Sequence, residues 1–462
     1  MDTVVKKNDQ VEVIIEDIGA DGEGIGKYKG YTLFIKDTVV GDHVLVNVMK
    51  TGKTYGYARL VKLIKPSDVR VEPRCPIATQ CGGCQIQHMD YREQLVYKEN
   101  KVKNCLQRIG GFSNFTMEPI SGMEEPYYYR NKSQFPVGRN KDGSVAIGFY
   151  AGRTHSIMDT DHCYIGAKVN IDIVKFIRNF ISDYKIEPYD EESHKGLLRH
   201  ILTRVGYSTG EVMVCLVING KDFPRKAELV EGLKKIPGMK SISLNLNKDK
   251  TNVILGERIV PVWGEPYITD YIGPIQYRIS PLSFFQVNPV QTKKLYEIAL
   301  DYADLHGDEV VWDLYCGIGT ISLFLAQKAK MVYGVEIIPQ AIEDAKTNAN
   351  INEIKNVEFY VGAAEEVLPR KYREENISAD VIVVDPPRKG CDQSLLDTIL
   401  AMAPKRVVYV SCDPATLARD LKYLCEKNYE LVKVRAVDQF GHSVHVETCV
   451  LLTRKNVLKY YK

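Results

Sequence analysis

The first thing this 462-residue sequence lacks is a long hydrophobic run. No segment approaches the about 20 consecutive apolar residues that a membrane-spanning helix needs. Residues 1–9 also contain no apolar stretch long enough for a secretory signal peptide. We therefore expect a cytoplasmic protein that has no membrane partner.

A large excess of one charge is missing as well. The 61 Lys and Arg residues nearly balance the 59 Asp and Glu residues, which leaves a formal net charge of +2. Charge alone therefore does not indicate nucleic-acid binding, and any basic RNA-binding surface must be local. Repeats and low-complexity tracts are also absent, so the length indicates about three ordinary globular domains.

Cysteine, in contrast, is abundant, with eleven residues. Because the cytosol keeps thiols reduced, clustered cysteines indicate metal binding or catalysis and not a disulfide framework. Cys75, Cys81 and Cys84 share one glycine-containing loop, and Cys163 is the natural fourth ligand. Such thiolate sites hold zinc or an iron–sulfur cluster. Three close thiols with one remote thiol favour a cluster, zinc is the alternative, and His162 is expected to be a neighbour of the site.

The first two domains are expected to be a barrel and an α+β region. Residues 1–64 contain β-branched runs separated by glycines, which predict an OB-like five-stranded barrel, with a generic β module as the alternative. Residues 65–270 are expected to form the central domain with the cysteine loop, and segment 91–125 packs either there or on the catalytic domain. The elements predicted here are a helix over 91–109 and strands over 144–150, 201–205 and 212–218.

Residues 271–462 alternate between strand and helix patterns. This order predicts a mainly parallel sheet with helices on both faces, that is, a Rossmann-like α/β domain. The predicted strands are 309–314, 331–336, 357–361, 380–385 and 406–411, and the predicted helices are 320–329, 339–350 and 393–402.

A glycine turn follows the first of these strands. Asp313 precedes Gly317 and Gly319, and Glu336 ends the next strand. A dinucleotide site would require a third glycine, whereas an acid before the turn suits a cationic ligand without phosphate, such as S-adenosylmethionine. Glu336 is placed to bind the two ribose hydroxyls, and residues 362–365 lie near the expected adenine pocket. The alternative is an ordinary strand–helix turn with surface acids.

A thiol and a carboxylate complete a candidate chemistry. Cys412 ends a strand, where open α/β sheets place their active sites, and Glu447 lies downstream. A thiolate that adds to C6 of a pyrimidine makes C5 nucleophilic toward a methyl donor, and a base then removes the C5 proton. Cys412 suits the first role and Glu447 the second. Asp385 would orient the ring or hold the cofactor, and Arg388 would complement the enolate or bind phosphate.

Other residues compete for these roles. Cys391 lies in a loop that opens a helix and is a weaker candidate for the nucleophile, and Cys316 is expected to be a backbone spacer. His442 and His445 are alternative bases, although histidines beside a strand more often make structural hydrogen bonds. A radical enzyme would need Cys-x-x-x-Cys-x-x-Cys, which is absent, and a DNA cytosine methyltransferase would have proline before its thiol, where this chain has serine.

Five motifs together resemble those of the RNA 5-methyluridine methyltransferase family. They are Ser-Phe-Phe-Gln-Val-Asn at 283–288, Asp-Leu-Tyr-Cys-Gly-Ile-Gly-Thr at 313–320, Asp-Pro-Pro-Arg-Lys-Gly at 385–390, Val-Tyr-Val-Ser-Cys-Asp-Pro-Ala-Thr at 408–416 and Asp-Gln-Phe-Gly-His-Ser-Val-His-Val-Glu at 438–447. The resemblance implies Cys412 as nucleophile and Glu447 as base. It places S-adenosylmethionine against Gln286, Tyr315, Glu336 and Asp385. The family usually has Asn and Pro where this chain has Asp413 and Gly441, and Asp413 is expected to raise the pKa of Cys412.

The resemblance also indicates the substrate and the other domains. Members that modify 23S ribosomal RNA combine an N-terminal RNA-binding TRAM barrel, the expected identity of residues 1–64, with a [4Fe-4S] cluster at the positions of the four cysteines named above. We therefore expect a monomeric enzyme that methylates uridine C5 in 23S ribosomal RNA. The alternatives are a transfer-RNA 5-methyluridine enzyme, or an RNA-binding ribosome-assembly factor without activity. Arg130 and Lys132, which lie among tyrosines, and Arg388 are candidate RNA contacts.

Overall fold

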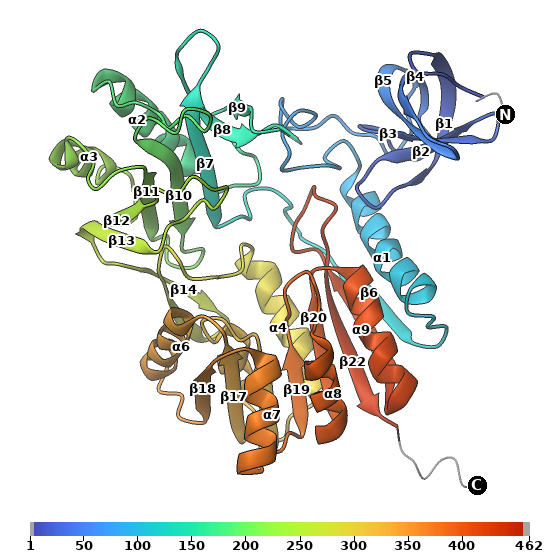
Figure 1. Ribbon diagram of the computed structural model, residues 1–462, viewed down its shortest axis with the longest axis vertical. Coiled ribbons are helices and arrows are strands. Elements are labelled where there is room, and N and C mark those ends of the chain that lie inside the picture. The colour runs from blue at the N-terminus through green and yellow to red at the C-terminus, as the bar shows by residue number, and fades with distance from the viewer. Residues whose placement is uncertain (1–3, 153, 456–462) are drawn as a thin grey trace. The chain divides into compact units, whose positions relative to one another are not determined.

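A computed structural model describes residues 4–152 and 154–455 of the chain (Figure 1). The chain divides into two compact units. The first comprises Met1–Lys101, Phe149–Met158 and Phe440–His445, and the second comprises Val102–Gly148, Asp159–Gln439 and Val446–Lys462. Among the helices of the described residues, none combines the length and the apolar character needed to cross a membrane.

The N-terminal strands form a closed barrel in the order β1-β2-β3-β5-β4, which confirms the expected five-stranded barrel. Its strands are β1 (Gln10–Ile18), β2 (Gly24–Tyr28), β3 (Tyr31–Ile35), β4 (His43–Thr51) and β5 (Tyr55–Lys65). Buried and exposed residues alternate along β1, β3 and β4, as expected for strands with one face toward a core. The barrel core is built from Val13, Leu33, Ile35, Val46 and their neighbours.

The central region holds a seven-stranded sheet in the order β13-β12-β11-β10-β7-β8-β9. The strands are β7 (Lys132–Arg139), β8 (Val145–Tyr150), β9 (Ile157–Asp159), β10 (Leu198–Val205), β11 (Val212–Ile218), β12 (Met239–Leu246) and β13 (Arg258–Gly264). The helices of this part of the chain are α1 (Tyr91–Arg108), α2 (Asn170–Asp183) and α3 (Lys226–Leu233). All seven residues of β11 are buried, because this strand lies between β10 and β12 and the sheet is covered there on both faces.

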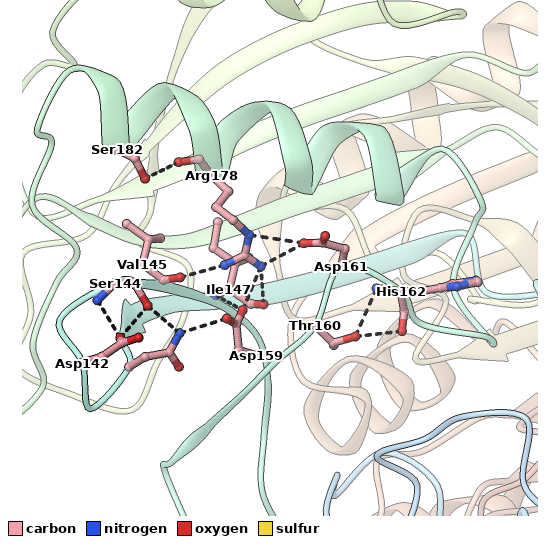
Figure 2. Close-up of polar contacts among 11 residues, drawn as sticks. Asp142, Ser144, Val145, Ile147, Asp159, Thr160, Asp161, His162, Arg178 and Ser182 are labelled. Carbon is pink, nitrogen blue, oxygen red and sulfur yellow. Dashed lines mark hydrogen bonds and ion pairs between the residues drawn. The ribbon is translucent and has the colours of Figure 1, made fainter.

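Arg178 on α2 fixes the segment that leads to Cys163. Its guanidinium donates to the carbonyls of Val145 and Ile147 and pairs with the carboxylates of Asp159 and Asp161, at 2.8 and 3.0 Å (Figure 2). A half-buried cation that bridges a strand, a turn and a helix restricts all three at once. The chain immediately before Cys163 is therefore held in place on the central domain.

The C-terminal region holds an eight-stranded sheet in the order β18-β17-β16-β19-β20-β22-β21-β6. A short hairpin of β14 (Ile268–Ile272) and β15 (Ile275–Ile279) precedes it. The strands are β6 (Thr116–Ser121), β16 (Val310–Leu314), β17 (Met331–Glu336), β18 (Val357–Val361), β19 (Val381–Val384), β20 (Arg406–Ser411), β21 (Tyr429–Val437) and β22 (Glu447–Arg454). The helices are α4 (Pro289–Ala303), α5 (Thr320–Ala326), α6 (Pro339–Ile351), α7 (Ala364–Glu375), α8 (Gln393–Met402) and α9 (Pro414–Lys427). Strands β16 to β20 are mutually parallel where they pair, which confirms the predicted α/β architecture.

Two hydrophobic cores cover opposite faces of this sheet. One contains residues of α4, α5 and α6, and the other contains residues of α7, α8 and α9, which lie together in Figure 1. Successive residues of β16 alternate between them, with Val311 in the first and Trp312 in the second. The order of the strands reverses between β16 and β19, so the loops after these two strands border the crevice where such sheets bind ligands.

Candidate functional site

The turn after β16 has the backbone that a close ligand requires. Gly317 and Gly319 have φ angles of 56° and 80°, which side chains other than glycine rarely adopt. A Cβ built on Gly317 would meet nothing within 4 Å, so the space above the turn is open. Tyr315 also has a positive φ, 72°, and its N–H donates to the carbonyl of Val335 at 2.9 Å. Glu336 joins this turn, since its carboxylate accepts from the N–H of Gly317 at 3.2 Å.

Asp313 is a fully buried carboxyl group at the end of β16. One of its oxygens accepts from the hydroxyl of Ser322 on α5, whereas Oδ1 has no partner among the described residues. Burial raises the pKa of Asp313 to about 7, and the two Ser322 hydrogen bonds oppose this rise. A buried, unsatisfied carboxylate oxygen costs free energy unless a ligand supplies a donor. Asp313 therefore fits the binding of a cationic amine above the turn.

Cys412 and Glu447 are neighbours across an antiparallel strand pair. Ser411, the last residue of β20, lies opposite Thr448 of β22, so the next position on each strand is Cys412 and Glu447. Cys412 is half-buried, and Glu447 is only 3% exposed. Burial, then the charges of Glu447 and Asp385, raise the pKa of Cys412 to about 11, while Arg388 opposes the rise. The structure thus brings together four of the residues selected from the sequence.

Burial and a neighbouring acid raise the pKa of each carboxyl group of this site, Asp313, Asp385 and Glu447. Burial and then Asp385 raise the pKa of Glu447, and Arg388 lowers it. Burial and then Asp313 raise the pKa of Asp385. Three neighbouring acids whose pKa values are raised by burial cannot all ionise easily, and the exposed Arg388 is the cation that acts on both Glu447 and Cys412. This arrangement places a thiol and a carboxyl group side by side with a cation that acts on both.

Asp413, a departure from the usual family pattern, is the N-cap of α9. Its side chain accepts from the N–H groups of Ala415 and Thr416 at 2.9 and 3.2 Å. Among the influences on the pKa of Cys412 it comes last, after burial, Glu447, Asp385 and Arg388. The expected direction is confirmed, but burial and not Asp413 dominates.

Sequence reasoning missed that α9 also holds the loop that carries Arg388. The hydroxyl of Thr416 donates to the carbonyl of Arg388 at 3.1 Å. One turn later, the carboxylate of Asp420 accepts from the N–H of Cys391 at 2.8 Å and from the hydroxyl of Tyr409 at 2.7 Å. Asp420 is 1% exposed. The spacing of Thr416 and Asp420 by four residues on one helix was the available signal.

Gln286 lies in a loop that the central sheet supports. It is 7% exposed, and its carbonyl accepts from the side chain of Asn131 at 3.1 Å. Arg204, which is buried, donates to the carbonyls of Pro281 and Ser283 in the same loop. Residues of the central sheet, Asn131 just before β7 and Arg204 of β10, therefore help to hold the Ser-Phe-Phe-Gln motif in place.

Arg130 and Lys132 lie at the start of β7, close to this loop. Lys132 is directly opposite Arg204 in the β7–β10 pair, and Nε of Arg130 donates to the carbonyl of Lys132 at 3.1 Å. Burial, Arg204 and Arg130 together lower the pKa of Lys132 to about 7. Three cations this close favour an anion nearby, and RNA phosphate is one.

The three N-terminal cysteines of the expected cluster, Cys75, Cys81 and Cys84, are half-buried and lie on one loop. The sulfur of Cys81 accepts from the N–H of Gly83 at 3.4 Å. Cys163 belongs to the other compact unit. Across residues 4–152 and 154–455, no three His, Cys, Asp or Glu side chains gather closely enough to hold a metal ion. His162, expected to be a neighbour, hydrogen-bonds to the hydroxyl of Tyr128 at 3.0 Å.

Two family profiles match the chain. The profile described as tRNA (Uracil-5-)-methyltransferase matches residues 272–455, and that of the TRAM domain matches residues 5–61. An uncharacterized RNA methyltransferase of Clostridium tetani is 51% identical over 453 residues, which cover 98% of each chain. One from Halalkalibacterium halodurans is also 51% identical, again with 98% of each chain covered.

One solved structure is similar over nearly the whole chain. It is the Pyrococcus abyssi tRNA (uracil-54, C5)-methyltransferase in complex with S-adenosyl-L-homocysteine. The identity is 29% and the TM-score is 0.77, and the match covers 96% of this chain and 100% of that one. The similarity therefore includes the barrel and the central region as well as the C-terminal sheet.

Proposed function

Because this chain belongs to the family of S-adenosylmethionine-dependent RNA uracil-5 methyltransferases, we propose that it methylates C5 of uridine in 23S ribosomal RNA. The main support for this chemistry is that Cys412 and Glu447 are neighbours across the pair of β20 and β22, with Arg388 close enough to act on both. Oxygen or nitrogen methylation would require no thiol next to a base at this place.

The protein side chains divide the reaction into two stages. In the first stage Cys412, as thiolate, adds to C6 of the uracil, and Arg388 stabilises the enolate oxygen that develops. The electron pair of the enolate forms the new bond from C5 to the methyl carbon, while the bond from that carbon to the sulfonium sulfur of the donor breaks and leaves a neutral thioether. In the second stage Glu447, as carboxylate, accepts the C5 proton, and the C5=C6 double bond re-forms as the bond from sulfur to C6 breaks. The thiolate is regenerated, and 5-methyluridine leaves.

S-Adenosylmethionine supplies the methyl group when it is bound, and the residues of the glycine turn fit it. The unpartnered oxygen of Asp313 suits the amino group of the ligand, and Glu336 suits the ribose hydroxyls. Tyr315, Gln286 and Asp385 surround the remaining parts in this proposal. Each is at least half-buried, so these side chains bind and orient the ligand in a site that excludes bulk water.

The preference for ribosomal RNA depends on the combination of the barrel with the four-cysteine set. The similar Pyrococcus enzyme acts on transfer RNA according to its name and matches this chain along its full length. Overall architecture therefore does not separate the two substrates, and transfer RNA is the second candidate. The cysteine set is the feature that favours ribosomal RNA.

We also propose that Cys75, Cys81, Cys84 and Cys163 hold a [4Fe-4S] cluster, with zinc as the alternative. The donor chemistry fits, because all four are cysteines and three share a short loop. Such a group would join the loop of residues 75–84 to the segment that Arg178 anchors, and we assign it no part in the methyl transfer.

Mapping of methylated nucleosides tests the substrate. Ribosomal and transfer RNA from a deletion strain, incubated with the purified protein and labelled methyl donor, should show new 5-methyluridine only in 23S RNA. Label in transfer RNA alone would select the second candidate. Methyl groups on nitrogen or oxygen would contradict the chemistry, and no transfer to any RNA would support the assembly-factor alternative.

A further inference from the structure

Glu447, the proposed base, lies at the end of a strand ladder. It is the first residue of β22 and pairs with Val437, the last residue of β21. The ends of a ladder open more easily than its middle, so strand pairing alone does not hold Glu447 firmly. The position of its carboxyl group therefore also depends on the turn that precedes β22, residues 440–445.

His442, in the middle of this turn, has an uncommon backbone conformation. Its φ angle is 67°, in the left-handed region that residues other than glycine seldom adopt. The residue is only 2% exposed. Because such a conformation is strained, it persists only where the surrounding structure enforces it.

Gln94 of α1 holds His442 at two points. Its Oε1 accepts from the backbone N–H of His442 at 3.0 Å, and its Nε2 lies 3.1 Å from Nδ1 of the imidazole ring. Nε2 also donates to the carbonyl of Met89 at 2.8 Å. The side chain of Gln94 is 0% exposed, so water does not compete for these hydrogen bonds.

These partners also determine the tautomer of the ring. The backbone N–H of His442 can only donate and the carbonyl of Met89 can only accept, so the oxygen and the nitrogen of the Gln94 amide cannot be exchanged. The amide nitrogen therefore donates to Nδ1 of His442, and the ring proton lies on Nε2. Since Nδ1 is occupied in this way, the ring is used to hold the turn.

Other groups of the same compact unit hold the rest of the turn. The carbonyl of His442 accepts from the N–H groups of residues 85 and 86, at 3.0 and 3.1 Å. Nζ of Lys98, which is 0% exposed, donates to the carbonyl of Phe440 at 2.9 Å. Lys98 follows Gln94 by four residues, so both side chains project from one face of α1.

We propose that Gln94 is a positioning residue for the methyl transfer. By holding His442 in its left-handed conformation, it fixes the point from which the chain enters β22 and so places the carboxyl group of Glu447. A displacement of about 1 Å in a reacting group is enough to slow a reaction strongly. This inference rests on the proposed role of Glu447 and adds a residue of α1 to the reaction. The competing explanation is that Gln94 only stabilises the fold.

The test measures the release of tritium from C5 of uracil, since this step requires the base. Full-length protein is given 23S ribosomal RNA, and separately transfer RNA, transcribed with tritium at uracil C5. Gln94→Leu keeps the buried volume and removes both hydrogen bonds to His442, so it should slow tritium release about tenfold. The bond from Cys412 to C6 forms earlier, and a covalent protein–RNA adduct should therefore accumulate on denaturing gels. The dissociation constant of S-adenosylmethionine should not change.

Two further variants separate the hold on the turn from other effects. His442→Gly relieves the left-handed backbone but removes the ring that Gln94 binds, so it should also release tritium slowly and accumulate adduct. If His442 served only to tolerate its φ angle, glycine would be the better residue and this variant would be fully active. Gln107→Leu makes the same substitution at an exposed position of α1 and should match the parent.

Each outcome supports or overturns the inference. Normal tritium release by Gln94→Leu would overturn it, and so would full activity of His442→Gly. Slow release with a lower melting temperature and no excess of adduct would limit Gln94 to stabilising the fold. Glu447→Gln distinguishes this failure from a failure of the proposed function. Normal release by Glu447→Gln would remove the base and the inference together, whereas a trapped adduct in Glu447→Gln beside a normal Gln94→Leu would refute only the role of Gln94.

Discussion

At the residue scale, the site contains three carboxyl groups and a thiol whose pKa values are raised mainly by burial. Asp313 and Glu447 are almost inaccessible to solvent, and Asp385 is half-buried beside them. Burial favours the neutral forms, so the two groups proposed to act as thiolate and carboxylate, Cys412 and Glu447, have raised pKa values. Arg388 is the one nearby cation, among the residues the structure describes, that lowers the pKa of both Cys412 and Glu447.

Removing the nucleophile should stop catalysis without loss of cofactor binding. We expect Cys412→Ala to abolish methyl transfer, while the dissociation constant of S-adenosylmethionine, measured by calorimetry, stays unchanged because Cys412 lies outside the glycine turn. Cys391→Ala, which alters a buried thiol beyond the loop, is the matched control and should remain active. An active Cys412→Ala variant would end the nucleophile assignment.

Removing the base should trap the covalent intermediate. With Glu447→Gln the C5 proton of the adduct has no acceptor, so a protein–RNA species should persist on denaturing gels. The double variant with Cys412→Ala should show no such band. Free RNA alone in the single variant would be inconsistent with Glu447 as the base.

The buried acids also predict how stability depends on pH. Their pKa values are raised in the folded chain above the unfolded values near about 4. At a pH between the unfolded and the folded pKa values, the folded state binds more protons than the unfolded state. The stabilisation that these acids give to the folded state is therefore complete below about pH 4, and it is lost as the pH rises through the folded pKa values, about 7 for Asp313. Urea unfolding of the ligand-free protein should show this loss from about pH 5 to 8, and Glu447→Gln should reduce it. A slope unaffected by the substitution would contradict the assignment.

At the element scale, α9 links Cys412, the proposed nucleophile, to the loop that bears Arg388. The helix starts directly after Cys412, Asp413 caps it, and Thr416 and Asp420 hold the loop one turn apart. A single rigid helix thereby sets the distance between the thiol and its cation, which a flexible loop could not do.

Two substitutions of Asp413 separate its charge from its capping role. Asp413→Asn keeps a good N-cap and removes the charge, so stability should be unchanged while the pH–rate profile moves slightly toward acid. Asp413→Ala loses the cap and should cost about 1 kcal/mol in chemical unfolding. Equal pH–rate profiles for Asp413→Asn and the parent would show that the charge does not reach Cys412.

Asp420 is expected to act as a positioning residue. Asp420→Ala would leave the N–H of Cys391 and the hydroxyl of Tyr409 without their acceptor, at a cost of about 2 kcal/mol in unfolding. Arg388 would lose its fixed place, so kcat should fall and the pH–rate profile should shift toward alkali, with cofactor affinity retained. Glu426→Gln, at an exposed position of the same helix, is the control. A variant with lower stability but an unshifted profile would limit Asp420 to a structural role.

At the scale of the whole molecule, the proposed cluster would join two parts of the chain. Protein purified without oxygen should be brown, and Cys84→Ser should remove the visible absorbance and lower the melting temperature. Cys425→Ser, a half-buried thiol of α9, should keep the colour. A colourless protein with one equivalent of zinc would select the alternative metal.

The sequence by itself determined the parts that local patterns and short motifs encode. Alternating apolar residues predicted β17, β18, α8 and β20 at or within a residue of their ends, because strand and helix periods are local properties. The glycine turn, Cys412 and Glu447 were selected in the same way, from the chemistry that each residue type can perform. Helices α7 and α9 were not predicted, since their mixed polar sequences became helical through packing against the sheet.

Only the tertiary structure decided which distant residues meet. The antiparallel pairing of β20 with β22 makes Cys412 and Glu447 neighbours, and the pairing of β3 with β5 brings the rings of Phe34 and Tyr57 together. The tertiary structure also shows that burial is the largest cause of the raised pKa of Cys412, and that Asp420 holds the loop that carries Arg388. Strand register, burial and the effect of neighbouring charges on a pKa all depend on how segments far apart in the chain pack together. A short stretch of sequence therefore cannot predict them.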